Sequence, residues 1–155
     1  MESVTTETPT PKPPPGKLAE EKWGEALRNG FQLIPNLLIQ SSHELGLDPL
    51  DVLILLNITA HWWQAAALPY PRPGMIADRI GVSRRTVERR LNDMEKSGVI
   101  KRLPTEQIRG ASVRRINPAG LVAKLTNLAR NAPVRRGAAG LDSKNEGDEA
   151  IDYGL

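Results

Sequence analysis

Arginines are concentrated in the stretch IGVSRRTVERRL, residues 80–91, where they occupy positions 84, 85, 89 and 90. Arg79 precedes the stretch. A guanidinium is always charged, and its planar set of donors matches both phosphate oxygens and the edge of guanine. A solvated helix face would explain part of this pattern, but a polyanionic partner explains it better. The stretch is therefore the first candidate for a nucleic-acid contact.

The positive charge of the chain is confined to one segment. The 155 residues carry a net charge of only +3, yet residues 71–130 hold 14 Lys and Arg against 5 Asp and Glu. Residues 31–70 hold no Lys or Arg and 3 acidic residues. An excess gathered in one part of the sequence is typical of a nucleic-acid-binding surface.

Local signals predict that the arginines lie on the second of two helices joined by a tight turn. The first helix is expected over about 74–80, and Gly81 is expected to adopt the positive φ of the turn. Ser83 is the expected N-cap of the second helix, which runs to about residue 96. On this helix an apolar stripe recurs at helical spacing, formed by Val87, Leu91 and Met94.

A hairpin is expected after the second helix. Residues 99–103 and 112–116 are predicted to be strands, and residues 104–111, PTEQIRGA, the loop between them. The order helix, glycine turn, helix and hairpin resembles the winged helix-turn-helix domains of bacterial, phage and plasmid regulators and replication proteins. The resemblance rests on MIADRIGVSRRTVERRLNDMEKSGVIKR and extends more loosely over residues 31–130. It implies a mainly α fold with a small β-wing.

The resemblance also implies how the protein would bind DNA. The second helix would enter the major groove, and the wing would contact the backbone or the minor groove. The candidate DNA-binding residues are Ser83, Arg84, Arg85, Thr86, Arg89 and Arg90 on the helix, and Gln107 and Arg109 in the wing.

Three of these residues are the best candidates to contact bases, because the start of a recognition helix reaches base edges most easily: Arg84, Arg85 and Arg89. Ser83 is explained equally well as a plain N-cap. Arg90 is expected either to lie against the first helix or to pair with Asp93 or Glu95.

Further elements are expected on both sides of this motif. Residues 31–35 are predicted to form a short strand, and residues 36–46 a helix that ends at Gly46. Residues 47–66 begin with Asp48 as N-cap, followed by Pro49, and are apolar almost all round, so this helix should be buried. A last helix is predicted from Asn117, with an apolar side formed by Leu121, Val122, Leu125 and Leu128.

The chain divides into three regions by composition. Residues 1–22 are rich in Pro and Thr and are predicted to be a disordered tail. Residues 23–130 are expected, from the resemblance, to form the winged helix-turn-helix DNA-binding domain. Residues 131–155 are predicted to be a second disordered tail with an acidic bias, and either tail could recruit a protein partner.

Other chemistry is not indicated. The chain has no cysteine and only two histidines, so no metal site is expected, and no motif suggests a cofactor or a catalytic residue. The chain is therefore not expected to be an enzyme.

No apolar run has the length of a membrane span, and the protein is expected to be cytoplasmic and associated with the nucleoid. His61, Trp62 and Trp63 are expected to pack at the end of the central helix, with base stacking as the alternative.

These observations predict a sequence-specific protein for double-stranded DNA, best explained as a transcriptional regulator of a bacterial, plasmid or phage system. The alternative is a replication-initiation or plasmid-partition adaptor that binds DNA repeats and recruits partner proteins. One helix and one wing cover few base pairs, so a homodimer is expected. The favoured contact is the apolar side of the last helix, and the other candidate is a set of N-terminal residues: Phe31, Leu33, Leu37 and Leu38.

Overall fold

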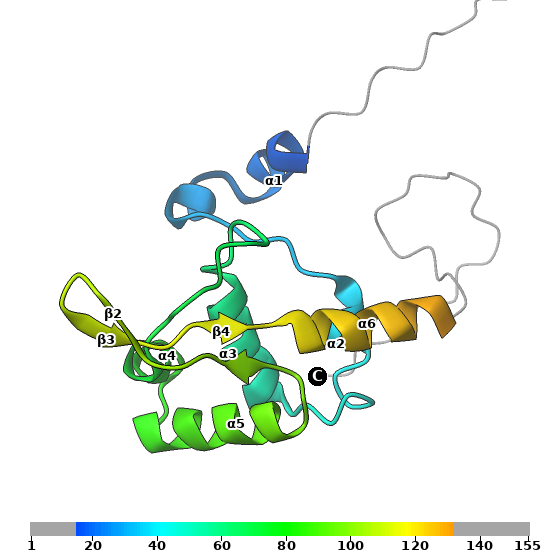
Figure 1. Cartoon of the computed structure of the whole chain (residues 1–155). Coiled ribbons are helices and arrows are strands. Elements are labelled where there is room, and N and C mark those ends of the chain that lie inside the picture. The colour runs from blue at the N-terminus through cyan, green and yellow to red at the C-terminus, as the bar shows by residue number, and fades with distance from the viewer. Residues whose placement is uncertain (1–14, 132–155) are drawn as a thin grey trace, which may run out of the picture.

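The computed structural model describes residues 15–131 (Figure 1). Most of this part is helical, and short antiparallel strands form a wing, which confirms the predicted fold class. The helices are α1 (Pro15–Trp23), the 3₁₀ helix η1 (Gly24–Asn29), α2 (Asn36–Gln40), α3 (Pro49–Thr59), α4 (Pro73–Ile80), α5 (Arg84–Lys96) and α6 (Ala119–Asn131). The strands are β1 (Lys101–Arg102), β2 (Glu106–Ile108), β3 (Ala111–Val113) and β4 (Ile116–Asn117).

Helix α3 lies at the centre of the hydrophobic core. Its residues Ile54, Leu55 and Ile58 are completely buried, and α3 packs against both α4 and α5. The predicted burial on every side does not hold at Leu53, which is 42% exposed. The helix also ends at Thr59, earlier than predicted, so the tryptophans that follow lie outside it.

The start of α3 is the predicted one. Asp48 is the N-cap and Pro49 occupies the first turn. The Asp51 N–H donates to Asp48 Oδ1 at 2.9 Å, and the Asp48 N–H donates to Asp51 Oδ2 at 3.1 Å. Each carboxylate therefore satisfies a backbone donor that the helix leaves free, as in a capping box.

Helices α4 and α5 form the predicted pair around Gly81, whose φ is +72°. The N–H groups of Gly81 and Val82 both donate to the carbonyl of Ala77, at 2.9 and 3.1 Å, which closes the end of α4. The Ser83 hydroxyl accepts from the N–H of Thr86 at 3.1 Å and caps α5. The apolar stripe of α5 is buried at all three positions, as expected: Val87, Leu91 and Met94.

The wing is more regular than predicted. Strand β1 pairs with β4, and β2 pairs with β3, both antiparallel. The prediction of a loop over residues 104–111 is wrong, because all of β2 and the first residue of β3 lie within it and only Arg109 and Gly110 form the turn between these strands. Both turn residues have positive φ, +49° and +78°, as a type I′ hairpin turn requires. Arg-Gly is a weaker signal for this turn than Asn-Gly, which is why the sequence did not reveal it.

The segment before α3 differs from the prediction in two ways. Residues 31–35 form no strand, since no other segment of the described chain offers them a ladder; instead the Gln32 side chain donates to the carbonyl of Leu56 at 3.1 Å. Helix α2 ends at Gln40 rather than at Gly46. The Ser42 hydroxyl donates to the carbonyl of Ile39 at 3.1 Å, and such a local bond competes with continuation of the helix.

The prediction of a tail over residues 1–22 is wrong from residue 15 onward, where α1 begins. The sequence of α1 contains the good helix formers Lys, Leu, Ala and Glu, with Pro15 in its first turn. The rest of that tail, and residues 132–155 of the tail predicted over 131–155, lie outside the described residues.

Helix α6 belongs to the core. Asn117 Oδ1 accepts from the N–H of Ala119 at 2.9 Å and caps the helix as predicted. Leu121 and Leu125 are buried, so the expectation that the apolar side of this helix forms an outer contact surface is wrong for these two residues. The Leu121 N–H donates to the carbonyl of Val99 at 2.7 Å. Gly120 lies so close to the turn after α5 that a Cβ on it would be 2.0 Å from the carbonyl oxygen of Gly98.

Candidate nucleic-acid interface

The solvent face of α5 carries two arginines that form no ion pair with any residue that the structure describes. Arg85 and Arg89 are one turn apart, and about 100° of rotation per residue places both opposite the buried stripe that includes Val87. Both are exposed, and neither forms an ion pair with any residue of the segment 15–131. Their guanidinium groups are therefore available to an external anion.

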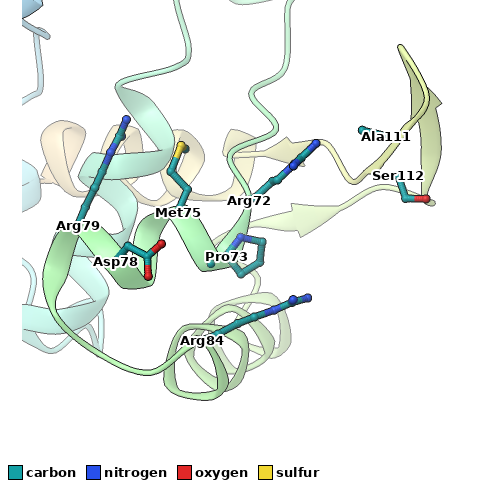
Figure 2. Close-up of a pocket in the computed structure, with 9 residues that line it drawn as sticks. Arg72, Pro73, Met75, Asp78, Arg79, Arg84, Ala111 and Ser112 are labelled. Carbon is teal, nitrogen blue, oxygen red and sulfur yellow. The ribbon is translucent and has the colours of Figure 1, made fainter.

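Arg84 lies at the start of α5 and faces a cleft between the two helices and the wing (Figure 2). Its side chain is 73% exposed, and its contact with Glu88 is long, at 3.5 Å. An exposed i,i+4 pair of this length contributes little and is easily exchanged for another anion. Arg84 is thus free to turn toward a ligand in the cleft.

The cleft has a volume of about 770 Å³ and is lined by α4, the start of α5 and strand β3. Arg72 and Arg79 line it together with Arg84, and Asp78 is the one carboxylate among the lining residues. Figure 2 shows Arg72 extending from the start of α4 toward β3. Three arginines around one open cleft make a strongly electropositive site.

Arg72 and Arg79 were not among the residues predicted from the sequence. Arg72 belongs to a proline-rich connector, LPYPRPG, and is the N-cap residue of α4. The sequence signal that could have identified Arg72 is the proline that follows it. A proline at the first helical position marks where α4 begins, and it therefore places Arg72 at the N-cap of that helix. Arg79 contacts the ring of His61 at 3.3 Å and is otherwise exposed.

The hydroxyls at the start of α5 are used locally. Ser83 acts as the N-cap, so this interpretation of the residue is confirmed. The Thr86 hydroxyl lies 2.8 Å from that of Ser83. A phosphate contact by either hydroxyl stays a prediction.

Arg90 lies on a different side of α5 and holds the fold together. It forms ion pairs with both carboxylates of the α3 capping box, with Asp48 and, at 3.6 Å, with Asp51. The predicted partners, Asp93 and Glu95, are wrong, because position 90 of α5 faces the start of α3. With its guanidinium occupied there, Arg90 is not part of the interface that we describe.

The two carboxylates respond differently to this arrangement. Burial raises the pKa of Asp51, more than the hydrogen bond from the Asp48 N–H lowers it. Burial also acts to raise the pKa of Asp48, but the hydrogen bond from the Asp51 N–H and the charge of Arg90 outweigh it, and the pKa is lowered. A charged Asp48 therefore suits the ion pair with Arg90.

The wing presents Arg109 at its tip. Arg109 is exposed and forms no ion pair within the described chain. Gln107 is exposed on β2, where its amide donates to the Ser112 hydroxyl at 2.7 Å and supports the hairpin. Of the two predicted wing residues, Arg109 is the one whose side chain is unoccupied.

Two further wing arginines are structural. Arg102 donates to Glu95 through its backbone N–H at 2.9 Å and through its guanidinium at 2.8 Å, and these bonds lower the pKa of Glu95. Arg115 pairs with Glu106, and its guanidinium lies 5.3 Å from the centre of the Tyr70 ring. These two arginines tie the wing to α5 and to the connector.

Comparison with known proteins supports this geometry. Residues 76–101 match a family model described as winged helix-turn-helix DNA-binding. The chain contains a winged helix-turn-helix. The matched residues run from α4 through the Gly81 turn and α5 to the first residue of the wing, and they include the exposed arginines of α5.

A solved structure shares the fold of this winged helix-turn-helix. It is the crystal structure of the N-terminal domain of DnaD protein from Geobacillus kaustophilus HTA426, with a TM-score of 0.50 and 23% sequence identity. The match covers 72% of this chain and 94% of that chain. No curated protein sequence matches the chain.

A winged helix-turn-helix typically binds without catalysing a reaction. Within residues 15–131, no three His, Cys, Asp or Glu residues are grouped so as to hold a metal ion. No helix of the same part is long and apolar enough to cross a membrane. The features that the structure brings together are basic side chains around α5 and the wing.

Proposed function

We propose that the protein binds double-stranded DNA sequence-specifically, with α5 in the major groove and the wing along the backbone. The observation that carries the proposal is the set of exposed arginines on α5: Arg84, Arg85 and Arg89. Within the part of the chain that the structure describes, Arg85 and Arg89 have no competing carboxylate, and Arg84 pairs only with Glu88, at 3.5 Å. Arginine bound bidentately to guanine is the commonest specific base contact in the major groove.

The remaining basic residues of this surface hold the DNA in register. Arg72 and Arg79 line the cleft beside α5, and Arg109 extends from the wing. Contacts of this kind go mainly to phosphates, and they position the protein without reading the sequence. Binding should therefore weaken steeply as the salt concentration rises.

Selection of binding sites from a pool of random-sequence duplexes tests the proposal. A conserved motif that is protected from nuclease by the pure protein is the expected result. Duplexes that bind equally well whatever their sequence would contradict the sequence-specific reading.

For the biological role we propose transcriptional regulation of a bacterial, plasmid or phage system. The second candidate is a replication-initiation or partition adaptor, and the observation that favours it is the shared fold with the N-terminal domain of DnaD, a replication-related protein. Mapping the sites that the protein occupies on its own genome separates the two roles. Sites that overlap promoters support regulation, and clustered repeats at one locus support the adaptor.

We further propose that two copies bind together on DNA. Leu121 and Leu125 are buried in the core, so α6 is not the expected contact between the two copies. The N-terminal segment is the better candidate, because Phe31 is 46% and Leu33 is 81% exposed there. Leu33→Asp should then reduce a dimer to a monomer in light scattering. A full-length chain that stays monomeric both free and on its site would overturn the dimer.

A further inference from the structure

A second cavity lies beside the arginine cleft, between the connector that follows α3 and the inner side of the wing. Its volume is about 810 Å³. Two aromatic rings line it, Trp63 and Tyr70, together with apolar side chains such as Ile108. Its charged lining residues are Arg72, Arg109 and Arg115, and no carboxylate is among the residues that line it.

The aromatic residues of this cavity are exposed. Trp63 is 76% exposed and Tyr70 is 44% exposed. Packing at the end of the central helix, the role expected from the sequence, is therefore wrong for Trp63. The mixture of exposed aromatic rings and cationic groups favours a partner with flat rings and negative charge.

The two cavities adjoin and share lining residues. Arg72, Met75 and Ala111 line both of them. In Figure 2, Arg72 extends from the start of α4 toward Ala111 of the wing, and both residues also line the second cavity. A strand whose phosphates follow the arginine cleft would bring its bases to the aromatic rings.

We propose that the second cavity binds unpaired bases of single-stranded DNA. One base would stack on the exposed ring of Trp63 and a neighbouring base on Tyr70, while Arg72 and Arg109 hold the phosphates. Arg115 is not assigned to a phosphate because its guanidinium already pairs with Glu106. Arg115 instead fixes the position of the Tyr70 ring. The inference rests on the proposed DNA-binding function and extends it from the duplex to a locally opened one.

Stacking on aromatic side chains is the usual way to bind single strands without reading their sequence. Each stacked base contributes enough that loss of one ring weakens binding about 5- to 150-fold. A protein segment in the same cavity would leave the lining arginines without an anionic partner, whereas the phosphates of a nucleic acid would pair with them. We therefore favour nucleic acid.

The test compares three DNA probes with the full-length protein: a duplex carrying the selected site, the same duplex with five unpaired thymines beside the site, and a thymine oligonucleotide. We expect Trp63→Ala to weaken binding of the thymine oligonucleotide at least 5-fold and to abolish the preference for the opened duplex. Binding of the closed duplex should be unchanged. Trp63→Phe should retain most of the affinity, because it retains a ring, and Tyr70→Ala is an independent second variant.

Trp23→Ala is the matched control, since Trp23 is also exposed, at 66%, but does not line the cavity. The inference would be overturned if the thymine oligonucleotide bound equally well to wild type, Trp63→Ala and Tyr70→Ala. It would also be overturned if Trp63→Ala changed the oligomeric state without changing thymine binding. The proposed function fails separately: it fails if the closed duplex is not bound, whatever the thymine probe shows.

Discussion

Arg90 of α5 pairs with Asp48, the residue that caps α3, whereas its neighbour Arg89 forms no ion pair within the described chain. The helical rotation of about 100° between adjacent residues separates their roles. Arg90 joins α5 to α3 at the centre of the core, and Arg89 faces solvent. Substitution of Arg90 should therefore destabilise the fold, and substitution of Arg89 should not.

Arg90→Ala should lower the free energy of unfolding by about 1–3 kcal/mol, because it removes charged hydrogen bonds and leaves the buried Asp51 without its cation. Arg89→Ala, the matched control, should change that free energy by less than about 0.5 kcal/mol. Urea denaturation at neutral pH measures both. Equal stability of the two variants would show that the ion pair does not join α5 to α3.

Gly120→Ala should destabilise the domain, because the added Cβ would lie 2.0 Å from the carbonyl oxygen of Gly98. Backbone on both sides must then move apart, at a cost of about 1–3 kcal/mol. The control is Gly74→Ala in α4, where nothing lies within 4 Å of the new Cβ and where alanine should raise helix stability by up to about 1 kcal/mol. Thermal melting that ranks Gly120→Ala at or above wild type would contradict the packing of α6 on this turn.

The contact between Glu95 and Arg102 should make stability depend on pH. The pKa of Glu95 is lowered from its ordinary value of 4.5, chiefly by the hydrogen bond from the Arg102 N–H. A lowered pKa means that the contact stabilises the fold fully above about pH 4.5 and that this stabilisation is lost as the pH falls through the lower, folded-state value.

Glu95→Gln should therefore melt below wild type at pH 7, and the difference should shrink as the pH falls below 4.5. Melting curves at pH 7, 5 and 3.5 measure this. A difference that is constant with pH would mean that the charge of Glu95 is not what Arg102 recognises.

Arg109→Asn should weaken binding to all duplexes about equally, since a wing contact to the backbone holds the protein without reading bases. Asparagine followed by glycine suits the two positive φ values of the turn, so the wing should stay folded. Gel shifts on the best site and on scrambled DNA measure the effect. A loss confined to the best site would make Arg109 a reader of bases or groove shape.

The parts of the fold that the sequence predicted are those with short-range causes. Gly81, Ser83 and the stripe that includes Val87 act within one or two helical turns, so α4, the turn and α5 were all expected. The strand expected over 31–35 failed because a strand needs a partner elsewhere in the chain, and residue types do not supply one.

The candidate site shows the same limit. The sequence identified the arginines of α5 and set Arg90 apart from the base-contact candidates, but it did not identify its partners, because Asp48 and Asp51 belong to a helix far away in the chain. It also missed Arg72, which reaches the cleft only because the proline-rich connector returns to the wing. The exposure of Trp63 depends on where α3 ends, and hydrophobicity alone predicted burial.

The most direct test of the central claim is the affinity of the double variant Arg84→Ala with Arg85→Ala for the selected site and for scrambled DNA. The control is Lys124→Ala with Arg130→Ala on α6, which removes the same charge away from the proposed interface. We predict that the α5 variant keeps its fold by circular dichroism, binds both duplexes at the weak level of scrambled DNA, and loses its footprint, while the control keeps its preference. A footprint at unchanged affinity in the α5 variant would contradict the assignment of α5 as the recognition helix.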